Sequence, residues 1–157
     1  MAGKNVNLVL KEALQKISPS KGELESIKCI VDDFKKSVEK NIKEMKIGAE
    51  VFVGGSFAKK TIIRKDAYDI DFFIRFEKRH KDISELTRKI LANYRKKEVK
   101  GSRNYFIIDK GDFFIEIVPV LKVSNPRKSE NVTDLSYSHV SYIKKKIKNP
   151  KILDEIK

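Results

Sequence analysis

The run Asp-Ile-Asp-Phe-Phe-Ile-Arg-Phe at residues 69–76 constrains the fold more than any other segment of this chain. Side chains alternate between the two faces of a strand, so every second residue from Ile70 to Phe76 builds one continuous apolar face. Such a face must be covered by other elements. The opposite face begins with Asp69 and Asp71, whose Cα atoms lie about 7 Å apart in an extended strand. Adjacent carboxylates repel each other, so the pattern favours a divalent-cation site over the alternative of a solvent-exposed strand end.

Two helices are predicted ahead of this strand. Apolar residues at helical spacing indicate a helix over residues 6–17 that ends at Ser18-Pro19. A longer helix begins at Ser20 and Glu23, which form a capping-box pair, and closes near Gly48. No catalytic residue type interrupts either apolar stripe, so both helices are interpreted as scaffold.

After Gly48 the pattern indicates a sheet. The predicted strands cover residues 51–53, 69–76, 104–108 and 113–120, with a hairpin turn at 109–112. A helix capped by Asp82 or Ser84 extends to about Tyr94, and helical periodicity returns near Ser136 after a polar loop over residues 124–135. The order helix, helix, strand, strand, helix, hairpin, helix predicts an α/β or α+β domain.

Composition favours a polyanionic partner. Lys and Arg number 35 against 22 Asp and Glu, a formal net charge of +13, and this excess suits nucleic-acid binding unless it reflects a generally lysine-rich proteome. The single cysteine, Cys29, excludes an internal disulfide and a cysteine-rich zinc cluster. No apolar run approaches the length of a transmembrane helix, so we expect a cytoplasmic protein without a membrane partner.

Three neighbours strengthen the cation-site interpretation of the acidic strand. Gly54-Gly55-Ser56 follows a strand directly, and glycine there allows backbone amides to approach an anion. Four cations stand between this loop and the acids, namely Lys59, Lys60, Arg64 and Lys65. Glu116 lies inside an apolar strand, where a lone carboxylate is costly without a partner. A sheet that brings Glu116 beside Asp69 and Asp71 would supply that partner, a shared metal.

These motifs resemble the nucleotidyltransferase superfamily that includes DNA polymerase β, and within it the class I, archaeal-type CCA-adding enzymes. Residues 55–64, Gly-Ser-Phe-Ala-Lys-Lys-Thr-Ile-Ile-Arg, are similar to that family's loop Gly-Ser-Tyr-Ala-Arg-x-Thr-x-Leu-(Arg/Lys). Residues 116–119, Glu-Ile-Val-Pro, resemble its Asp-Val-Val-Pro strand, and residues 134–139 fit its Asp, Thr and His segment with Ser136 in place of Thr. The resemblance covers the whole chain and implies an α+β fold, with a mixed polymerase β-like palm sheet packed against helices.

The resemblance also implies a reaction and a set of site residues. An RNA 3′-hydroxyl would attack the α-phosphate of CTP or ATP at a tRNA 3′ end, with Asp69, Asp71 and Glu116 holding two Mg²⁺ ions. The nucleotide would be bound by Gly55, Ser56, Lys59, Arg64, Ser136 and His139. Two residues depart from the family pattern: Lys59 replaces an arginine, and Glu116 replaces an aspartate.

The family has later domains for base selection and tRNA binding, including a lysine and a tyrosine that contact the nucleotide. We therefore expect residues 1–135 to form the catalytic head and 136–157 the first helices of a following domain. A helix begins at Asn149-Pro150, with Ile152, Leu153 and Ile156 on its apolar side. This region would be completed by a second polypeptide or a homodimer, unless the chain is truncated. Alone, the chain should bind Mg²⁺-nucleotide weakly and with little base selectivity.

Two other functions stay open. A stand-alone minimal nucleotidyltransferase could modify a protein or small RNA, or act as an oligoadenylate-type synthase. A non-enzymatic RNA-binding module is disfavoured by the intact acid trio.

Several further residues have both functional and structural interpretations. The basic cluster Arg95-Lys96-Lys97 with Lys100 is either an RNA-facing edge or a solvated surface. Tyr105 and Phe106 either stack on bases or pack in the core. His80 is interpreted as part of a solvated basic turn.

Overall fold

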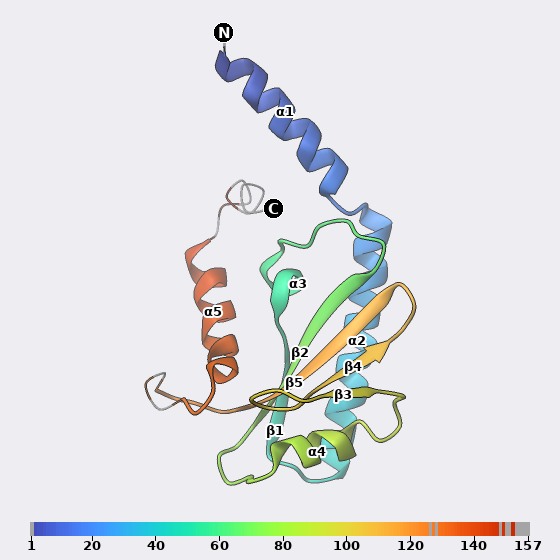
Figure 1. Cartoon of the computed structure of the whole chain (residues 1–157), viewed down its shortest axis with the longest axis vertical. Helices are drawn as coiled ribbons and strands as arrows, with labels where there is room; N and C mark the ends of the chain where they lie inside the picture. Colours follow the sequence, from blue (N-terminus) through green and yellow to red (C-terminus); the bar gives the residue numbers. More distant parts are fainter. Residues whose placement is uncertain (1, 126, 128, 148, 150–151, 153–157) are drawn as a thin grey trace.

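The computed structural model describes residues 2–125, 127, 129–147, 149 and 152. Its centre is a five-stranded sheet, and its strands in spatial order are β1 (Ala49–Val53), β2 (Tyr68–Phe76), β5 (Phe113–Leu121), β4 (Tyr105–Asp109) and β3 (Lys97–Val99). β2 and β5 are parallel and all other neighbours are antiparallel, so the sheet is mixed. The fold is therefore α+β, as the sequence predicts (Figure 1).

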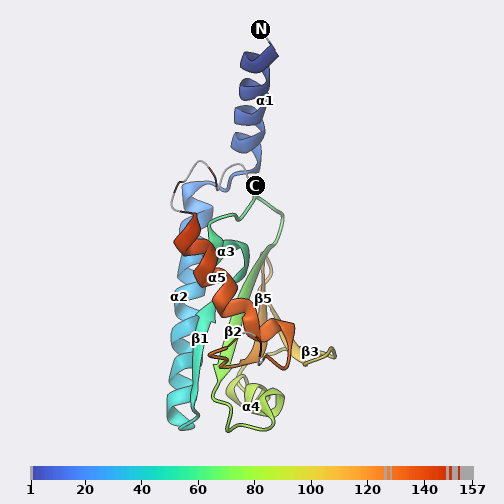
Figure 2. The same ribbon diagram turned by 90° about the vertical axis from the view of Figure 1, so that its left-hand side faces the viewer.

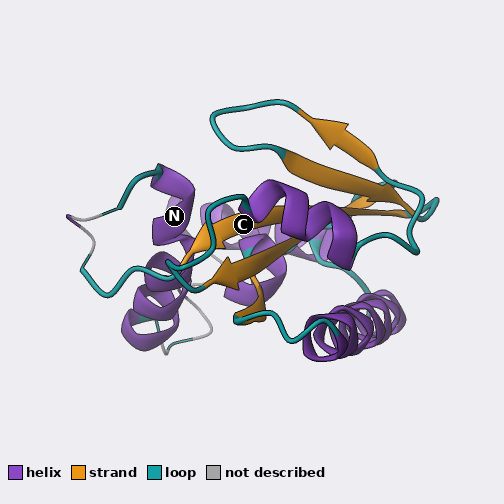
Figure 3. Cartoon of the chain, turned by 90° about the horizontal axis from the view of Figure 1, so that it is seen from below, coloured by secondary structure: helices purple, strands orange, loops and turns teal. Residues whose placement is uncertain are grey.

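One face of the sheet packs on two helices, α2 (Lys21–Glu44) and α4 (Ile83–Ile90). Figure 3 shows α2 nearly end-on along one side of the sheet. The predicted apolar face of β2 lies in this core, where Ile70, Phe72, Ile74 and Phe76 are 0% exposed. Asn41 on α2 donates from Nδ2 to the Ile90 carbonyl at 2.8 Å, which joins the two helices.

The start of α2 is fastened to the start of β2. The predicted capping box is present, with the Glu23 amide donating to Ser20 Oγ at 3.2 Å and the Ser20 amide donating to Glu23 Oε2 at 2.6 Å. Tyr68 also donates its hydroxyl to Glu23 Oε1 at 2.9 Å. These hydrogen bonds from Ser20 and Tyr68 lower the pKa of Glu23 to about 2. The first residue of the acidic strand is thus held against a helix terminus.

Helix α1 (Ala2–Ile17) extends away from the sheet domain (Figures 1 and 2). The periodicity of its sequence correctly predicts the helix. Val6, Val9 and Leu10 are more than half exposed, so its apolar stripe adds little to the core.

The remaining helices lie beside the β1–β2 side of the sheet. They are the short α3 (Gly55–Lys59), the 3₁₀ turn η2 (Val132–Leu135) and α5 (Ser136–Lys146). Tyr137 anchors α5, because its ring meets Phe52 edge-on at 5.2 Å and the Arg75 guanidinium lies 4.0 Å from the ring centroid. Arg75 also pairs with Glu50 at 2.7 Å. The acid-bearing face of β2 is therefore covered by α5 near Arg75 and left accessible near Asp69.

Several features differ from the sequence expectations, and one is that residues 55–59, expected as a loop, form α3. α4 ends at Ile90 rather than near Tyr94, the polar loop contains η2, and residues 97–99 form a strand. In the predicted helix from Asn149 onward, Leu153 and Ile156 lie outside the described residues. Within the described part of the chain, no helix has both the length and the apolar character needed to cross a membrane.

Candidate active site

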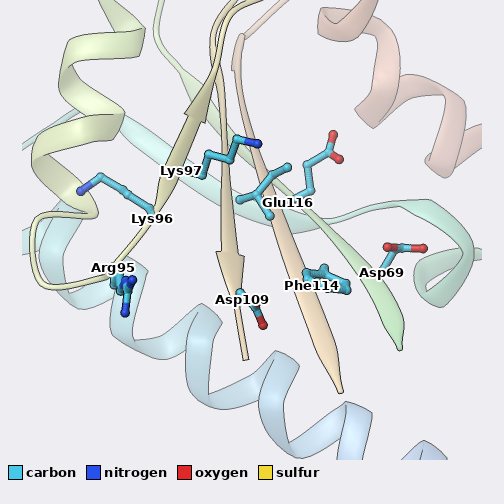
Figure 4. A pocket seen from close by; sticks show the side chains of 8 residues that line it. Asp69, Arg95, Lys96, Lys97, Asp109, Phe114 and Glu116 are labelled. Carbon is cyan, nitrogen blue, oxygen red and sulfur yellow. The ribbon is translucent and has the colours of Figure 1, made fainter. Parts of the chain in front are cut away.

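The three predicted acids share one side of two parallel strands. Asp71 pairs in register with Glu116, and Asp69 pairs with Phe114 two residues earlier along the same strands. Because alternate residues share a face, Asp69, Asp71 and Glu116 all lie opposite the packed core. Figure 4 shows the Asp69 and Glu116 carboxylates on the same side of the sheet. The sheet thus brings together the carboxylates that the sequence places 45 positions apart, from 71 to 116.

The glycine loop lies directly against Asp71. The Gly54 amide donates to the Asp71 carbonyl at 2.8 Å, and Gly55 has a φ of +57°. A Cβ atom built on Gly55 would lie 1.6 Å from Asp71 Oδ2, and one built on Gly54 would lie 2.4 Å from the Phe73 ring. Glycine at both positions is therefore required for the loop to approach the acidic strand.

Burial and mutual repulsion disturb the titration of these acids. Burial raises the pKa of Asp71, and the charge of Asp69 raises it further, while Lys59 acts in the opposite direction. Burial likewise raises the pKa of Glu116, with Asp71 and then Asp69 adding to the effect. Such a cluster of like charges is stabilised by a cation that neutralises it.

The donor set fits a hard divalent cation, which prefers carboxylate oxygens. Among the described residues, however, no three His, Cys, Asp or Glu side chains converge closely enough to hold an ion without movement. Lys65 is one reason why the three carboxylates do not converge. Its Nζ lies 2.8 Å from Asp69 Oδ2, and the Asp69 side chain is 61% exposed. The Asp69 carboxylate would have to leave Lys65 in order to join Asp71 and Glu116 at an ion.

The predicted nucleotide-binding residues divide into two groups. Ser56 lines a hollow of about 310 Å³ together with Lys65 and Asp69, and Lys59 lies close enough to Asp71 to affect its pKa. Arg64 instead pairs with Glu23 at 3.3 Å, at the start of α2. In this structure Arg64 therefore fastens the loop to α2 and is not gathered with the acids.

The segment that starts α5 is held by a buried ion pair. Asp134, whose side chain is 0% exposed, pairs with Arg103 and accepts the Leu121 amide at 2.8 Å. Ser136 begins α5 and is half-buried, whereas His139 is exposed one turn later. α5 lies beside α3 (Figures 1 and 2), so Ser136 and His139 are carried by the helix next to the glycine loop.

A second, larger hollow of about 740 Å³ opens on the other side of the acids. Its lining comprises Asp69, Arg95, Lys96, Lys97, Ile107, Asp109, Phe114 and Glu116 (Figure 4). Sequence reasoning identified the basic cluster at 95–97 but not Phe114, which alternation alone would have placed on the acid face. Phe106, considered above for base stacking, is 0% exposed and belongs to the core.

The fold and the acid trio define a nucleotidyltransferase domain, and comparison with known proteins agrees. Residues 5–149 match the family model described as "Second Messenger Oligonucleotide or Dinucleotide Synthetase domain". This match covers most of the chain, so the chain belongs to that family of nucleotidyltransferase domains.

Curated relatives with similar sequences are archaeal CCA-adding enzymes. The chain is 44% identical to that of Nanoarchaeum equitans over 103 residues, which cover 63% of this chain and 26% of the relative. It is 28% identical to that of Pyrococcus horikoshii over 148 residues, covering 89% of this chain and 32% of the relative. The matched part of the chain thus spans about a quarter to a third of the length of these enzymes.

Solved structures show the same fold at low sequence identity. A cytoplasmic RNA terminal U-transferase superposes with a TM-score of 0.66 at 13% identity, over 96% of this chain and 42% of that one. The Escherichia coli MS115-1 protein CdnC, solved with ATP, gives 0.63 at 19% identity, over 85% of this chain and 48% of that one. Both support the polymerase β-like fold.

Proposed function

We propose that this chain is the catalytic head of an enzyme that transfers CMP and AMP from CTP and ATP to the 3′ end of tRNA. The observation that carries the proposal is the pairing of Asp71 with Glu116 beside Gly55, in a chain similar to archaeal CCA-adding enzymes. The archaeal relatives are roughly two and a half to three times as long as this chain, because the 103 and 148 matched residues make up 26% and 32% of them. Their remaining regions, on this polypeptide or a second one, would select the base and hold the tRNA.

Each site residue has a role in this reaction. The acceptor O3′ forms a bond with the α-phosphorus, the bond to the bridging oxygen breaks, and pyrophosphate leaves. Asp69, Asp71 and Glu116 would hold Mg²⁺, which when bound stabilises charge on the attacking and leaving oxygens. Glu116 would hold the ion that activates the attacking hydroxyl.

The triphosphate is assigned to the side of the glycine loop. Ser56 and Lys65 line the smaller hollow beside Asp69, and Lys59 lies near Asp71. Ser136 and His139 on α5 would approach the phosphates from the neighbouring helix. Arg64 would have to leave Glu23 to take part, so we assign it the weakest role in nucleotide binding.

The test is incorporation of labelled CMP or AMP into tRNA that lacks its 3′ end. The chain is assayed alone and with a polypeptide carrying the later domains of an archaeal CCA-adding enzyme. We expect little incorporation by the chain alone, clear incorporation with the partner, and none by Asp71→Ala under either condition. Incorporation that survives Asp71→Ala, or none with any partner, would overturn the proposal.

A second candidate follows from the family model, whose description names oligonucleotide and dinucleotide synthesis. In that case the chain would join nucleoside triphosphates to one another without tRNA. Chromatography of a reaction with CTP and ATP alone distinguishes the two, because short oligonucleotides would form only under the second function.

A further inference from the structure

Lys65 lies between two fixed points of the loop that connects α3 to β2. Before it, the Arg64 amide donates to the Ile17 carbonyl at 2.6 Å, and the Arg64 guanidinium pairs with Glu23 at 3.3 Å. After it, Tyr68 donates its hydroxyl to the same Glu23 at 2.9 Å. The backbone on both sides of Lys65 is therefore fastened to helix termini. Its side chain is 48% exposed and can change partners without displacing the loop.

The present partner of this side chain is the first acid of the site. Lys65 Nζ lies 2.8 Å from Asp69 Oδ2, and the Asp69 side chain is 61% exposed. Lys65 has no other acidic partner within 4.0 Å among the residues that the structure describes. Exposed ion pairs of this kind are weak, so a more highly charged ion replaces either partner at little cost.

Asp69 stands between two hollows, and Lys65 lines only the smaller of them. Ser56, Lys65 and Asp69 belong to the lining of the smaller hollow, whereas Glu116 lines the larger one together with Asp69. The ion pair thus engages the Asp69 carboxylate on the side of the glycine loop. An ion shared with Asp71 and Glu116 requires this carboxylate to be free of Lys65.

The smaller hollow is also the one assigned above to the triphosphate. Phosphate oxygens accept charge-assisted hydrogen bonds from an ammonium group. A triphosphate carries more negative charge than one carboxylate, so it attracts the Lys65 ammonium more strongly than Asp69 does. The carboxylate that Lys65 leaves is a ligand for a hard cation. One lysine can therefore neutralise Asp69 before the nucleotide binds and the triphosphate afterwards.

We propose that Lys65 exchanges Asp69 for the triphosphate, and that this exchange couples the binding of nucleotide to the binding of metal. Before the nucleotide binds, Lys65 holds Asp69 apart from the other two acids. A triphosphate in the smaller hollow takes Lys65 and frees Asp69 for the ion, and an ion on Asp69 likewise frees Lys65 for the triphosphate. The proposal rests on the proposed function, and it gives a positioning role to a residue outside the acid trio.

Thermodynamic linkage sets the size of the effect. Without metal, a nucleotide must break the pair of Lys65 with Asp69 before it gains Lys65. With metal, that pair is already broken, so the nucleotide gains the same contact without the cost. The metal-free dissociation constant, divided by the one with metal, should therefore be larger in the unsubstituted chain than in a chain without the pair. For an exposed ion pair the difference is about 1.5- to 5-fold.

Calorimetry measures this ratio without RNA. The chain is titrated with the α,β-methylene analogue of CTP, which cannot be consumed, once in EDTA and once in saturating Mg²⁺. Lys65→Met is titrated in the same way. Mg²⁺ also binds the nucleotide in solution, but this affects all variants equally and cancels when their ratios are compared. We expect the ratio to fall by about 1.5- to 5-fold in Lys65→Met, with most of the lost affinity appearing in Mg²⁺.

Two further variants serve as controls. Lys65→Arg keeps a cation that binds both carboxylate and phosphate, so it should retain the ratio of the unsubstituted chain. Lys60→Met removes a cation from the same loop that, in the described part of the chain, has no acid within 4.0 Å. Whatever its effect on affinity, Lys60→Met should leave the ratio unchanged. Thermal melts confirm that each variant is folded.

The outcomes separate the exchange from the proposed function. An unchanged ratio in Lys65→Met, or an equal fall in Lys60→Met, would overturn the exchange and leave the proposed function standing. A ratio that depends on Lys65, without incorporation of CMP or AMP into tRNA by the chain and its partner, would count against the proposed function alone. Absence of nucleotide binding in Mg²⁺ would overturn both.

Discussion

Gly55 and Asp71 are packed so closely that a Cβ atom on the glycine would overlap the carboxylate, at 1.6 Å from Oδ2. The contact joins the loop that begins α3 to the strand that carries the acids. Gly55 also has a φ of +57°, a conformation that costs other residues about 1–2 kcal/mol. The position of Asp71 therefore depends on the absence of a side chain at Gly55, 16 positions earlier in the sequence.

Replacing Gly55 by alanine should displace Asp71 and destabilise the fold. Backbone strain and the overlap together should cost more than about 2 kcal/mol of unfolding free energy and remove nucleotide binding. The matched control is Gly22→Ala on α2, where nothing lies within 4 Å of the new Cβ. That change should be neutral or stabilising by up to about 1 kcal/mol in a helix. Urea denaturation measures both, and equal effects would contradict the packing described here.

The raised pKa values of Asp71 and Glu116 predict a stability cost at neutral pH. In the unfolded chain both carboxyls ionise at a lower pH than in the folded chain. The free energy of unfolding therefore falls as the pH rises from the unfolded pKa values to the raised folded ones. The cost is absent below about pH 4, where the unfolded carboxyls are also protonated. Asp71→Asn should therefore stabilise the metal-free chain at neutral pH by up to about 1 kcal/mol and have no such effect near pH 4.

Denaturation at both pH values, with and without Mg²⁺, checks this prediction. The control is Asp66→Asn, an exposed aspartate in the loop before β2, which should change stability little at either pH. Added Mg²⁺ should stabilise the unsubstituted chain and the control, but not Asp71→Asn, because only a folded site binds the ion. Destabilisation of Asp71→Asn at neutral pH would show that repulsion among the acids is not significant.

The contact between Lys65 and Asp69 predicts competition with the metal. Their 2.8 Å ion pair is exposed, and such pairs contribute about 0.2–1 kcal/mol. Lys65→Met should therefore raise the affinity for Mn²⁺ alone by about 1.5- to 5-fold, since Asp69 no longer has to leave a partner. Electron paramagnetic resonance of free Mn²⁺ measures this directly. Lys81→Met removes the same charge beyond the far end of β2, and an equal gain there would exclude a specific effect of Lys65.

The local features of this site could be predicted from the sequence, and the long-range ones could not. Alternation in residues 69–76 places Asp69 and Asp71 on one face, and the capping box at Ser20 and Glu23 needs only adjacent turns. The pairing of Asp71 with Glu116 depends on a parallel register across the whole β3–β4 region, which no local pattern encodes. Glu116 could be singled out as a lone carboxylate inside an apolar strand. Alternation places Phe114 on the same face, but its exposure follows only from the structure.

The short strand β3 is a second feature that the sequence alone could not predict. Three residues are too few for alternation to be detected, so the cluster at 95–97 could be interpreted only by its charge. The pairing of β3 with β4 places Lys97 in line with Glu116, and Lys97 lines the larger hollow. The ion pair of Arg103 with Asp134 joins residues 31 positions apart, and neither residue type predicts burial.

That ion pair should be the most sensitive contact outside the core. Asp134 is 0% exposed in its side chain and also accepts the Leu121 amide at 2.8 Å and the Asn131 amide at 3.2 Å. Arg103→Met would leave the buried carboxylate without its cation, which typically costs about 3–5 kcal/mol. Because Asp134 precedes Ser136, we expect α5 to loosen and the affinity for nucleotide to fall along with stability.

A matched pair of variants separates burial from simple charge loss. Arg88 pairs with Glu98 at 2.9 Å, but its side chain is 43% exposed, so Arg88→Met should cost no more than about 1 kcal/mol. In the double variant Arg103→Met with Asp134→Asn, the neutral amide still accepts the Leu121 amide, and part of the lost stability should return. Urea denaturation of the four proteins measures these differences. If Arg103→Met costs no more than Arg88→Met, the buried pair does not hold the start of α5.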